Sequence, residues 1–167
     1  MANPLNNEQE IYSRIDKERI TVPPLVWDIV YRYLGDELTA ISQITLSYCI
    51  ANEPIAVEDA KKIIEHAKNI NIMVRQILIP ENIKDDTSDL QELKKINSKL
   101  HPVINELFFH YVGNDLYGIT MIVGSYLGPD VDEPVPVDSA KKVLNKVLSM
   151  KQFLDKLREA THQDIRQ

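Results

Sequence analysis

The residues best suited to chemistry lie within one stretch of the chain, Phe108 to Ile119. His110 stands four residues after Glu106 and four residues before Asn114. Side chains four apart in a helix are neighbours, so the carboxylate and the amide can hold the imidazole in one tautomer and orientation. A neutral imidazole held in this way can act as a nucleophile. We therefore predict His110 as the candidate catalytic residue, with Glu106 and Asn114 as orienting neighbours.

The spacing resembles the phosphoacceptor helix of sensor histidine kinases, the dimerisation and histidine phosphotransfer hairpin. In that family the His is followed four residues on by Asn or Thr, six on by Leu and nine on by an aliphatic residue. This chain has Asn114, Leu116 and Ile119 at those distances from His110. The layout is also similar, with a lead-in helix, the His helix, a loop and a second helix. The resemblance implies a phosphoacceptor role for His110 and a response-regulator receiver domain as the protein partner.

Two departures from the family narrow this expectation. Tyr111 follows His110 where the family often has a charged residue, and the Asn-rich and Gly-rich boxes of an ATP-binding module are missing from the sequence. Self-phosphorylation is therefore not expected, and no cofactor is expected either. The resemblance leaves a relay, in which His110 takes a phosphoryl group from one receiver aspartate and passes it to another. Gly113 and Tyr117, one to two turns after His110, are expected to form part of the docking surface.

The same stretch belongs to the second copy of an internal repeat. Pro24 to Tyr48 returns as Pro102 to Tyr126 with eight identical positions. Glu53 to Lys62 then returns as Glu133 to Lys142 with six identical positions. A repeat of this kind predicts two similar structural units, and the positions that differ between the copies indicate where function can reside in only one of them.

The copies differ at the predicted site. Arg32 takes the place of His110 and Asp36 takes the place of Asn114, while Gly35 matches Gly113. An arginine cannot accept a phosphoryl group in this chemistry, so only the second copy can be active. We expect Arg32 and Asp36 to contribute to partner binding instead.

Hydrophobic residues at helical spacing predict a lead-in helix, a long helix, a loop and a second long helix in each copy. The lead-in helices are expected at 8–20 and 88–100, and the last helices at 58–78 and 138–161. One hairpin cannot bury its own apolar stripe, whereas two can pack into a four-helix bundle. We predict an all-α domain over 1–167 with pseudo-twofold symmetry, made of repeat 1 (7–79), a linker (80–87) and repeat 2 (88–161).

Composition excludes several other classes of protein. The net charge of −6 and the pI near 5.2 argue against nucleic-acid binding, which requires a positive surface. No stretch approaches the roughly 20 apolar residues of a membrane span, and the polar N-terminus does not resemble a signal peptide, so a cytoplasmic location is expected. The single Cys49 permits no intrachain disulfide, and the four His residues share no metal-ligand spacing. His66 is expected on a polar face of its helix.

Three functional alternatives remain open from the residues alone. The first is a signalling protein that acts through protein contacts, with phosphotransfer at His110 as its sharpest form. The second is a scaffold protein that does not catalyse a reaction. The third is a small-molecule sensor, because Ser47, Ser125 and Thr120 are expected near one another in the core. A monomer suffices for a closed bundle, and a dimer through Trp27 or the lead-in helices is the alternative. The four glycines from Gly113 to Gly128 are expected to serve close packing.

Overall fold

The structure is a computed structural model, and it describes residues 4–78 and 100–161 of the chain. Both ends of every long helix of the bundle lie within these two ranges. The predicted linker at 80–87 lies outside the described residues, as does all but the last residue of the predicted lead-in helix at 88–100.

The described chain is helical, which confirms the predicted all-α class. It begins with α1 (Pro4–Glu18). The first long helix follows as α2 (Pro24–Ile29), a π-helical turn η1 (Val30–Leu34) and α3 (Gly35–Ala51), and α4 (Val57–Leu78) returns beside it. The second long helix is built in the same order from α6 (Pro102–Leu107), the π-helical turn η3 (Phe108–Val112) and α7 (Gly113–Gly124). The last helix is α8 (Val137–Thr161).

Proline begins both of the long helices. Pro24 and Pro102 each occupy a first helical position, where the missing N–H leaves no hydrogen bond unmade. At α6 the side chain of His101 completes the start, since its Nδ1 accepts a hydrogen bond from the backbone N–H of Val103 at 3.2 Å. Asn52 ends α3 in the left-handed region with φ 55°, a conformation that asparagine tolerates better than most residues.

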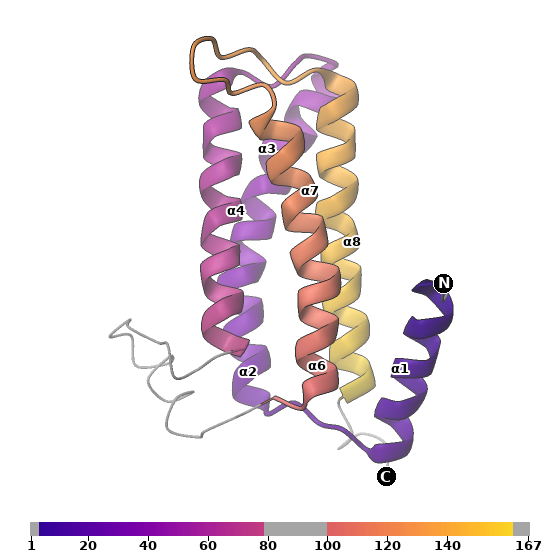
Figure 1. Ribbon diagram of the computed structural model, residues 1–167. Coiled ribbons are helices and arrows are strands. Elements are labelled where there is room, and N and C mark those ends of the chain that lie inside the picture. Colours follow the sequence, from indigo (N-terminus) through magenta and orange to yellow (C-terminus); the bar gives the residue numbers. More distant parts are fainter. Residues whose placement is uncertain (1–3, 79–99, 162–167) are drawn as a thin grey trace.

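The four long helices stand at the corners of a bundle (Figure 1). Helix α3 packs against α4 and α8, and α7 packs against the same two helices, so that α3 and α7 occupy opposite corners. Helix α1 lies outside this square, against α8. The core is a single cluster of buried side chains from both halves of the chain, including Leu38, Ile63, Ile119 and Val147.

The π-helical turns were not predicted, since the sequence pattern indicated uninterrupted helices. Such a turn makes hydrogen bonds from i to i+5 and shifts the residues after it relative to the residues before it. The two turns fall at equivalent positions of the repeat, and each is followed by a glycine, Gly35 or Gly113. The long helices thus share a local irregularity as well as a sequence pattern.

The loops at one end of the bundle meet through a short antiparallel bridge. The backbone N–H of Ile55 donates to the carbonyl of Val135 at 2.8 Å, and the N–H of Val135 donates to the carbonyl of Ile55 at 3.0 Å. These two residues are equivalent in the repeat. The pseudo-twofold relation between the two halves stays a prediction, with which this pairing agrees.

Candidate functional site

The imidazole of His110 is exposed on η3, and two side chains lie beside it. Asn114 is its neighbour one turn on, with Nδ2 at 3.5 Å from Nδ1 of the imidazole, at the long limit of a hydrogen bond. The Tyr111 ring meets the imidazole edge to face, with 4.8 Å between the ring centroids. Because the Asn114 amide nitrogen can only donate, this contact makes Nδ1 of His110 the acceptor and places the proton of the neutral imidazole on Nε2.

The predicted arrangement around His110 is therefore present in part. The structure brings His110 and Asn114 together as the spacing predicted. Glu106 is exposed on α6, and among the described residues no hydrogen bond or ion pair joins it to His110. The imidazole thus has an amide neighbour and an aromatic neighbour, and its remaining surface faces solvent.

A row of exposed apolar side chains runs next to His110. Phe109, Tyr117 and Met121 are 53%, 68% and 55% exposed. They stand with Gly113 at intervals of four residues, which places them along one ridge of the helix. The space above Gly113 is open, since a Cβ built there would meet no atom within 4 Å. We call Phe109, Gly113, Tyr117 and Met121 the apolar ridge.

Sequence reasoning identified half of this ridge. Gly113 and Tyr117 were predicted as docking residues, whereas Phe109 and Met121 were missed. Both missed residues fall outside the core stripe of the long helix, and that position was the signal that could have found them. A large apolar side chain off the core stripe is left in water unless something else covers it.

The equivalent surface of the first repeat is built differently. Tyr31, at the position of Phe109, donates from its hydroxyl to Oδ1 of Asp155 at 2.7 Å, and the Arg158 guanidinium lies 4.9 Å from the centre of its ring. Burial and the Asp155 hydrogen bond raise the pKa of Tyr31 to about 12. This aromatic side chain is engaged with α8 within the protein, so the equivalent positions of the first repeat do not form an apolar ridge, although Leu46 and Ile50 are exposed further along α3.

Arg32 and Asp36 do not join the surface around His110. Both are exposed, but they lie on η1 and α3, and α3 and α7 occupy opposite corners of the bundle. Any contribution of Arg32 and Asp36 to binding would involve a separate face. The contribution of Arg32 and Asp36 to partner binding stays a prediction.

Polar side chains join the two helices within each hairpin at equivalent positions of the repeat. Glu37 on α3 pairs with His66 on α4, and the Asn69 amide donates to the same carboxylate at 3.4 Å. His66 thus contacts a polar partner, as its prediction on a polar face of the helix implies, but it is half-buried in a hairpin contact. In the second hairpin these positions hold Asp115, Lys146 and Ser149, and burial raises the pKa of Asp115 although Ser149 and Lys146 act in the opposite direction.

The glycines of the second repeat serve different purposes. Gly118 lies under the Lys146 side chain, whose Cε would be 2.6 Å from a Cβ at this position. Gly124 has open space above it, as Gly113 has, and Gly128 lies in the loop after α7. Close packing, which was predicted for all four glycines, is found at Gly118 and at Gly128, where a Cβ would lie 2.9 Å from the carbonyl oxygen of Val131, but is wrong for Gly113 and Gly124.

The polar side chains expected to gather in the core do not do so, while two buried polar atoms, Nε1 of Trp27 and Oδ1 of Asn105, have no hydrogen-bond partner among the described residues. The buried polar side chains of the described ranges are Thr45 and Thr161, which donate to carbonyls of their own helices at 2.9 and 2.8 Å. Ser47, Ser125 and Thr120 are exposed, so their expected grouping in the core was wrong. Within residues 4–78 and 100–161, no three His, Cys, Asp or Glu side chains gather in a way that could hold a metal ion.

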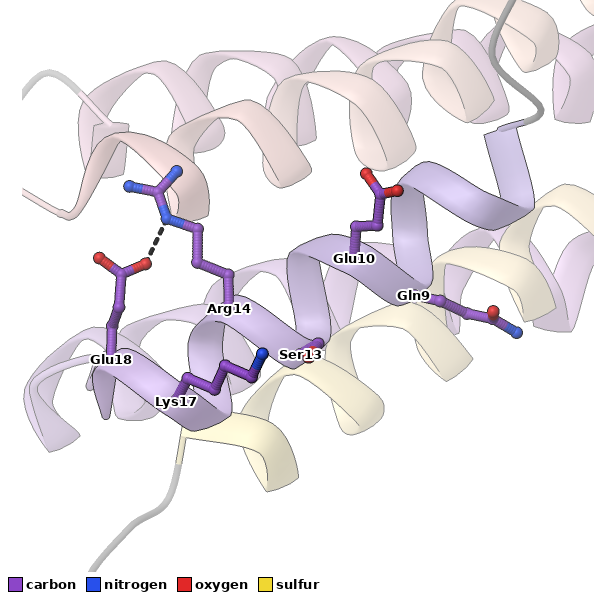
Figure 2. A pocket seen from close by; sticks show the side chains of 6 residues that line it. All are labelled: Gln9, Glu10, Ser13, Arg14, Lys17 and Glu18. Carbon is purple, nitrogen blue, oxygen red and sulfur yellow. Dashed lines mark hydrogen bonds and ion pairs between the residues drawn. The ribbon is translucent and has the colours of Figure 1, made fainter.

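A pocket lies along the outer face of α1. Figure 2 shows the six polar side chains that line it, Gln9, Glu10, Ser13, Arg14, Lys17 and Glu18. Arg14 and Glu18 form an ion pair one turn apart. All of these residues are on one helix and carry mixed charges, so the pocket presents no constellation for catalysis. None of the helices in the described ranges has the length and apolar character needed to cross a membrane.

Comparison with known proteins adds no identification. No protein family, no curated protein and no solved structure matches the chain.

Proposed function

We propose that this protein acts by binding another protein through the outer face of α6, η3 and α7. The observation that carries the proposal is the apolar ridge beside His110 and Asn114. Single exposed apolar residues are ordinary in soluble proteins, but several in one row mark an interaction surface more often. Tyrosine, phenylalanine and methionine are also among the residues enriched in protein interfaces.

The π-helical turn at this face gives further support. π turns inside α-helices occur frequently at functional sites, where they alter which side chains share a face. In η3 the turn includes both Phe109 and His110. The equivalent turn η1 includes Tyr31 and Arg32. The ring of Tyr31 is engaged with α8 through the hydrogen bond to Asp155. The two turns have the same backbone form, and only η3 leaves its aromatic side chain exposed, since Phe109 is exposed whereas Tyr31 is half-buried.

A cross-linking experiment tests this proposal. A photoreactive amino acid placed at Tyr117 should yield a covalent adduct with a defined partner in the source cells. The matched control carries the same group at Thr39, which is the equivalent exposed position of the first repeat. An adduct at Tyr117 that is missing at Thr39 is expected. Equal labelling from both positions, or no adduct from either Tyr117 or Phe109, would contradict the proposal.

Phosphotransfer at His110 is the second candidate function, favoured by the exposed imidazole and the neighbouring Asn114. In this reaction the imidazole nitrogen attacks the phosphorus of an aspartyl phosphate on a receiver domain. The new N–P bond forms as the P–O bond to the aspartyl carboxylate breaks, and the carboxylate leaves. The contact from the Asn114 amide nitrogen to Nδ1 of His110 would hold the ring in one orientation before the attack.

A labelling experiment separates the two candidates. The protein is incubated with a receiver domain that carries a labelled phosphoryl group, and acid-labile label is measured on wild type, His110→Ala and Asn114→Ala. Phosphotransfer predicts label on wild type, none on His110→Ala and slower labelling of Asn114→Ala. An unlabelled wild type rules this chemistry out for that donor. Partner binding that survives in His110→Ala then identifies a non-catalytic interaction protein.

A further inference from the structure

The charge of the second repeat indicates what kind of partner its face can bind. Residues 100–140 contain six acidic residues and no lysine or arginine. Glu106 lies exposed beside the apolar ridge, and Asp130 and Glu133 are exposed in the loop that follows α7. Lys61 of α4 partly neutralises Asp132 at 3.4 Å, and Lys146 of α8 lies near Asp115. The basic side chains near this segment thus belong to the neighbouring helices and are partly engaged.

We propose that the apolar ridge binds a cationic amphipathic helix of a partner protein, a statement that rests on the proposed function and specifies it. The apolar side chains of such a helix would pack between Phe109 and Tyr117, over Gly113. Its flanking lysine or arginine side chains would lie toward Glu106 and the acidic loop. From Phe109 to Met121 the ridge is about 18 Å long at 1.5 Å per residue, which matches three to four turns of a partner helix.

The shape of the ridge favours a helix over an extended segment. Residues four apart form the ridges by which helices pack together, and a helix that binds in a groove anchors itself through side chains at similar intervals. Gly113 forms a gap between two large rings. No neighbouring atom excludes a side chain at Gly113, and glycine is a poor helix former there. Gly35 is equally open in the first repeat, so what is specific to the second repeat is that large exposed rings, Phe109 and Tyr117, flank the glycine.

The charge also disfavours a second copy of this chain as the occupant. Each copy carries a net charge of −6, and each would present an acidic face to the other. Like charges brought together at an interface oppose association, whereas a cationic partner is attracted from a distance. Self-association is therefore an outcome that the experiment must be able to detect.

The experiment measures binding of labelled peptides to the full-length protein by fluorescence anisotropy. The first peptide is helical, with apolar residues on one face and lysine and arginine beside them. The second has glutamate in place of each basic residue, and the third keeps the composition but scrambles the apolar positions. We expect the first peptide to bind at least about tenfold more tightly than the other two, and to weaken as salt is added. Equal binding of all three peptides, or no binding of the first, would overturn the proposal.

Variants of the protein test whether the ridge is the site. Tyr117→Ala and Gly113→Gln should each weaken binding of the first peptide about tenfold, as expected for residues at the centre of an interface. Thr39→Ala and Gly35→Gln make the matching changes in the first repeat and should leave binding unchanged. Because Gly35 and Gly113 both follow a π-helical turn, any general effect on that turn appears in both glutamine variants. If Gly35→Gln weakened peptide binding as much as Gly113→Gln, the assignment of the apolar ridge as the binding site would be overturned.

Two outcomes separate this inference from the proposed function. If Tyr117 cross-links to a partner but no cationic peptide binds, the protein-binding function stands and the cationic helix is wrong. If the protein forms a concentration-dependent dimer in sedimentation analysis, and Tyr117→Ala abolishes it, the ridge joins two copies of the chain. That second result would also overturn the cationic-helix proposal.

Discussion

At the scale of single residues, the two repeats differ in how one aromatic side chain is held. Tyr31 and Phe109 occupy equivalent positions, yet Tyr31 is bound to Asp155 on α8 and Phe109 is 53% exposed. The repeat places Arg75 where Asp155 would be needed to accept a hydrogen bond, and Phe109 has no hydroxyl to donate. Both the donor and the acceptor of this hydrogen bond are thus missing from the second repeat, where the aromatic ring is exposed.

The Tyr31 hydroxyl should titrate late. Its pKa of about 12, against an ordinary value of 10.0, means that folding favours the protonated phenol. This contribution to stability is fully present below about pH 10 and is lost as the pH rises through about 12. In an absorbance titration of the seven tyrosines, Tyr31 should ionise near pH 12 and Tyr31→Phe should remove that step, whereas Tyr48, whose pKa is raised by its hydrogen bond to Asp59, should still ionise late in the variant. A late step of unchanged size in the variant would contradict the assignment.

The pairing of Gly118 with Lys146 should be measurable as a coupling. In the first repeat, Ala40 is equivalent to Gly118 and His66 is equivalent to Lys146. The residue with a Cβ, Ala40, is thus paired with histidine, whose side chain is shorter than that of lysine. Alanine is the better helix former by about 1 kcal/mol, but in wild type the added Cβ must displace the end of Lys146. Gly118→Ala should therefore stabilise the protein more in a Lys146→Ala background than in wild type.

A double-mutant cycle of urea unfolding checks this coupling. The interaction between the two substitutions should be about 0.5 kcal/mol or more, since their side chains touch. Gly124→Ala is the control, because a Cβ at that position meets no atom within 4 Å. Its effect should be the same with and without Lys146. Additive effects for Gly118 and Lys146 would show that the lysine side chain moves away without loss.

At the scale of elements, hydrophobic periodicity predicted which segments are helical. The last helices were predicted at 58–78 and 138–161 and are found at Val57–Leu78 and Val137–Thr161. The lead-in helix was expected at 8–20 but begins at Pro4 and ends at Glu18. Apolar spacing reports these positions because each helix buries one stripe against the others.

The π-helical turns and the hairpin contacts could not be predicted in this way. A π turn leaves no clear mark in the hydrophobic pattern, because it adds one residue to a turn within a continuous helix. The contacts of His66 with Glu37 and of Lys146 with Gly118 depend on which helices become neighbours. His110 and Asn114 were predictable as neighbours because both lie on one helix. The apolar ridge was half predicted for the same reason.

Helix α1 should be able to detach without unfolding the bundle. It packs on α8 through the fully buried Ile15 and through Tyr12, whose ring lies 4.4 Å from the ammonium of Lys156. Ile15→Ala removes buried apolar area from this contact, which is worth about 1.5 to 3 kcal/mol for a whole side chain. We expect amide hydrogen exchange in α1 to become roughly tenfold faster or more, with exchange in α3 and α7 unchanged.

The control for this prediction is Ser13→Ala. Ser13 is exposed on the outer face of α1, so its replacement should not change the contact with α8. Faster exchange throughout all the long helices of Ile15→Ala would instead show that α1 is part of one cooperative unit with the bundle.

At the scale of the whole molecule, neither hairpin can account for its own stability. Helix α3 packs against α8 as well as its own partner α4, and α7 packs against α4 as well as α8. The core is a single cluster to which both halves contribute, and the bridge between Ile55 and Val135 joins their loops. A hairpin without its counterpart would expose the apolar stripe that the other half covers.

The two halves should therefore fold only together. Fragments 1–79 and 88–167, made separately, are expected to show little helix by circular dichroism at micromolar concentration, because each leaves its stripe in water. Mixing them should restore helicity with a one-to-one stoichiometry, and Ile119→Asp in the second fragment should prevent this, since Ile119 is fully buried. The control is Met121→Asp, which changes an exposed residue two positions away and should still permit assembly. A fragment that folds alone as a monomer would show that one hairpin is sufficient for folding. A fragment that forms a dimer with itself would show that the two copies of the repeat can replace each other in the core, although their surfaces differ.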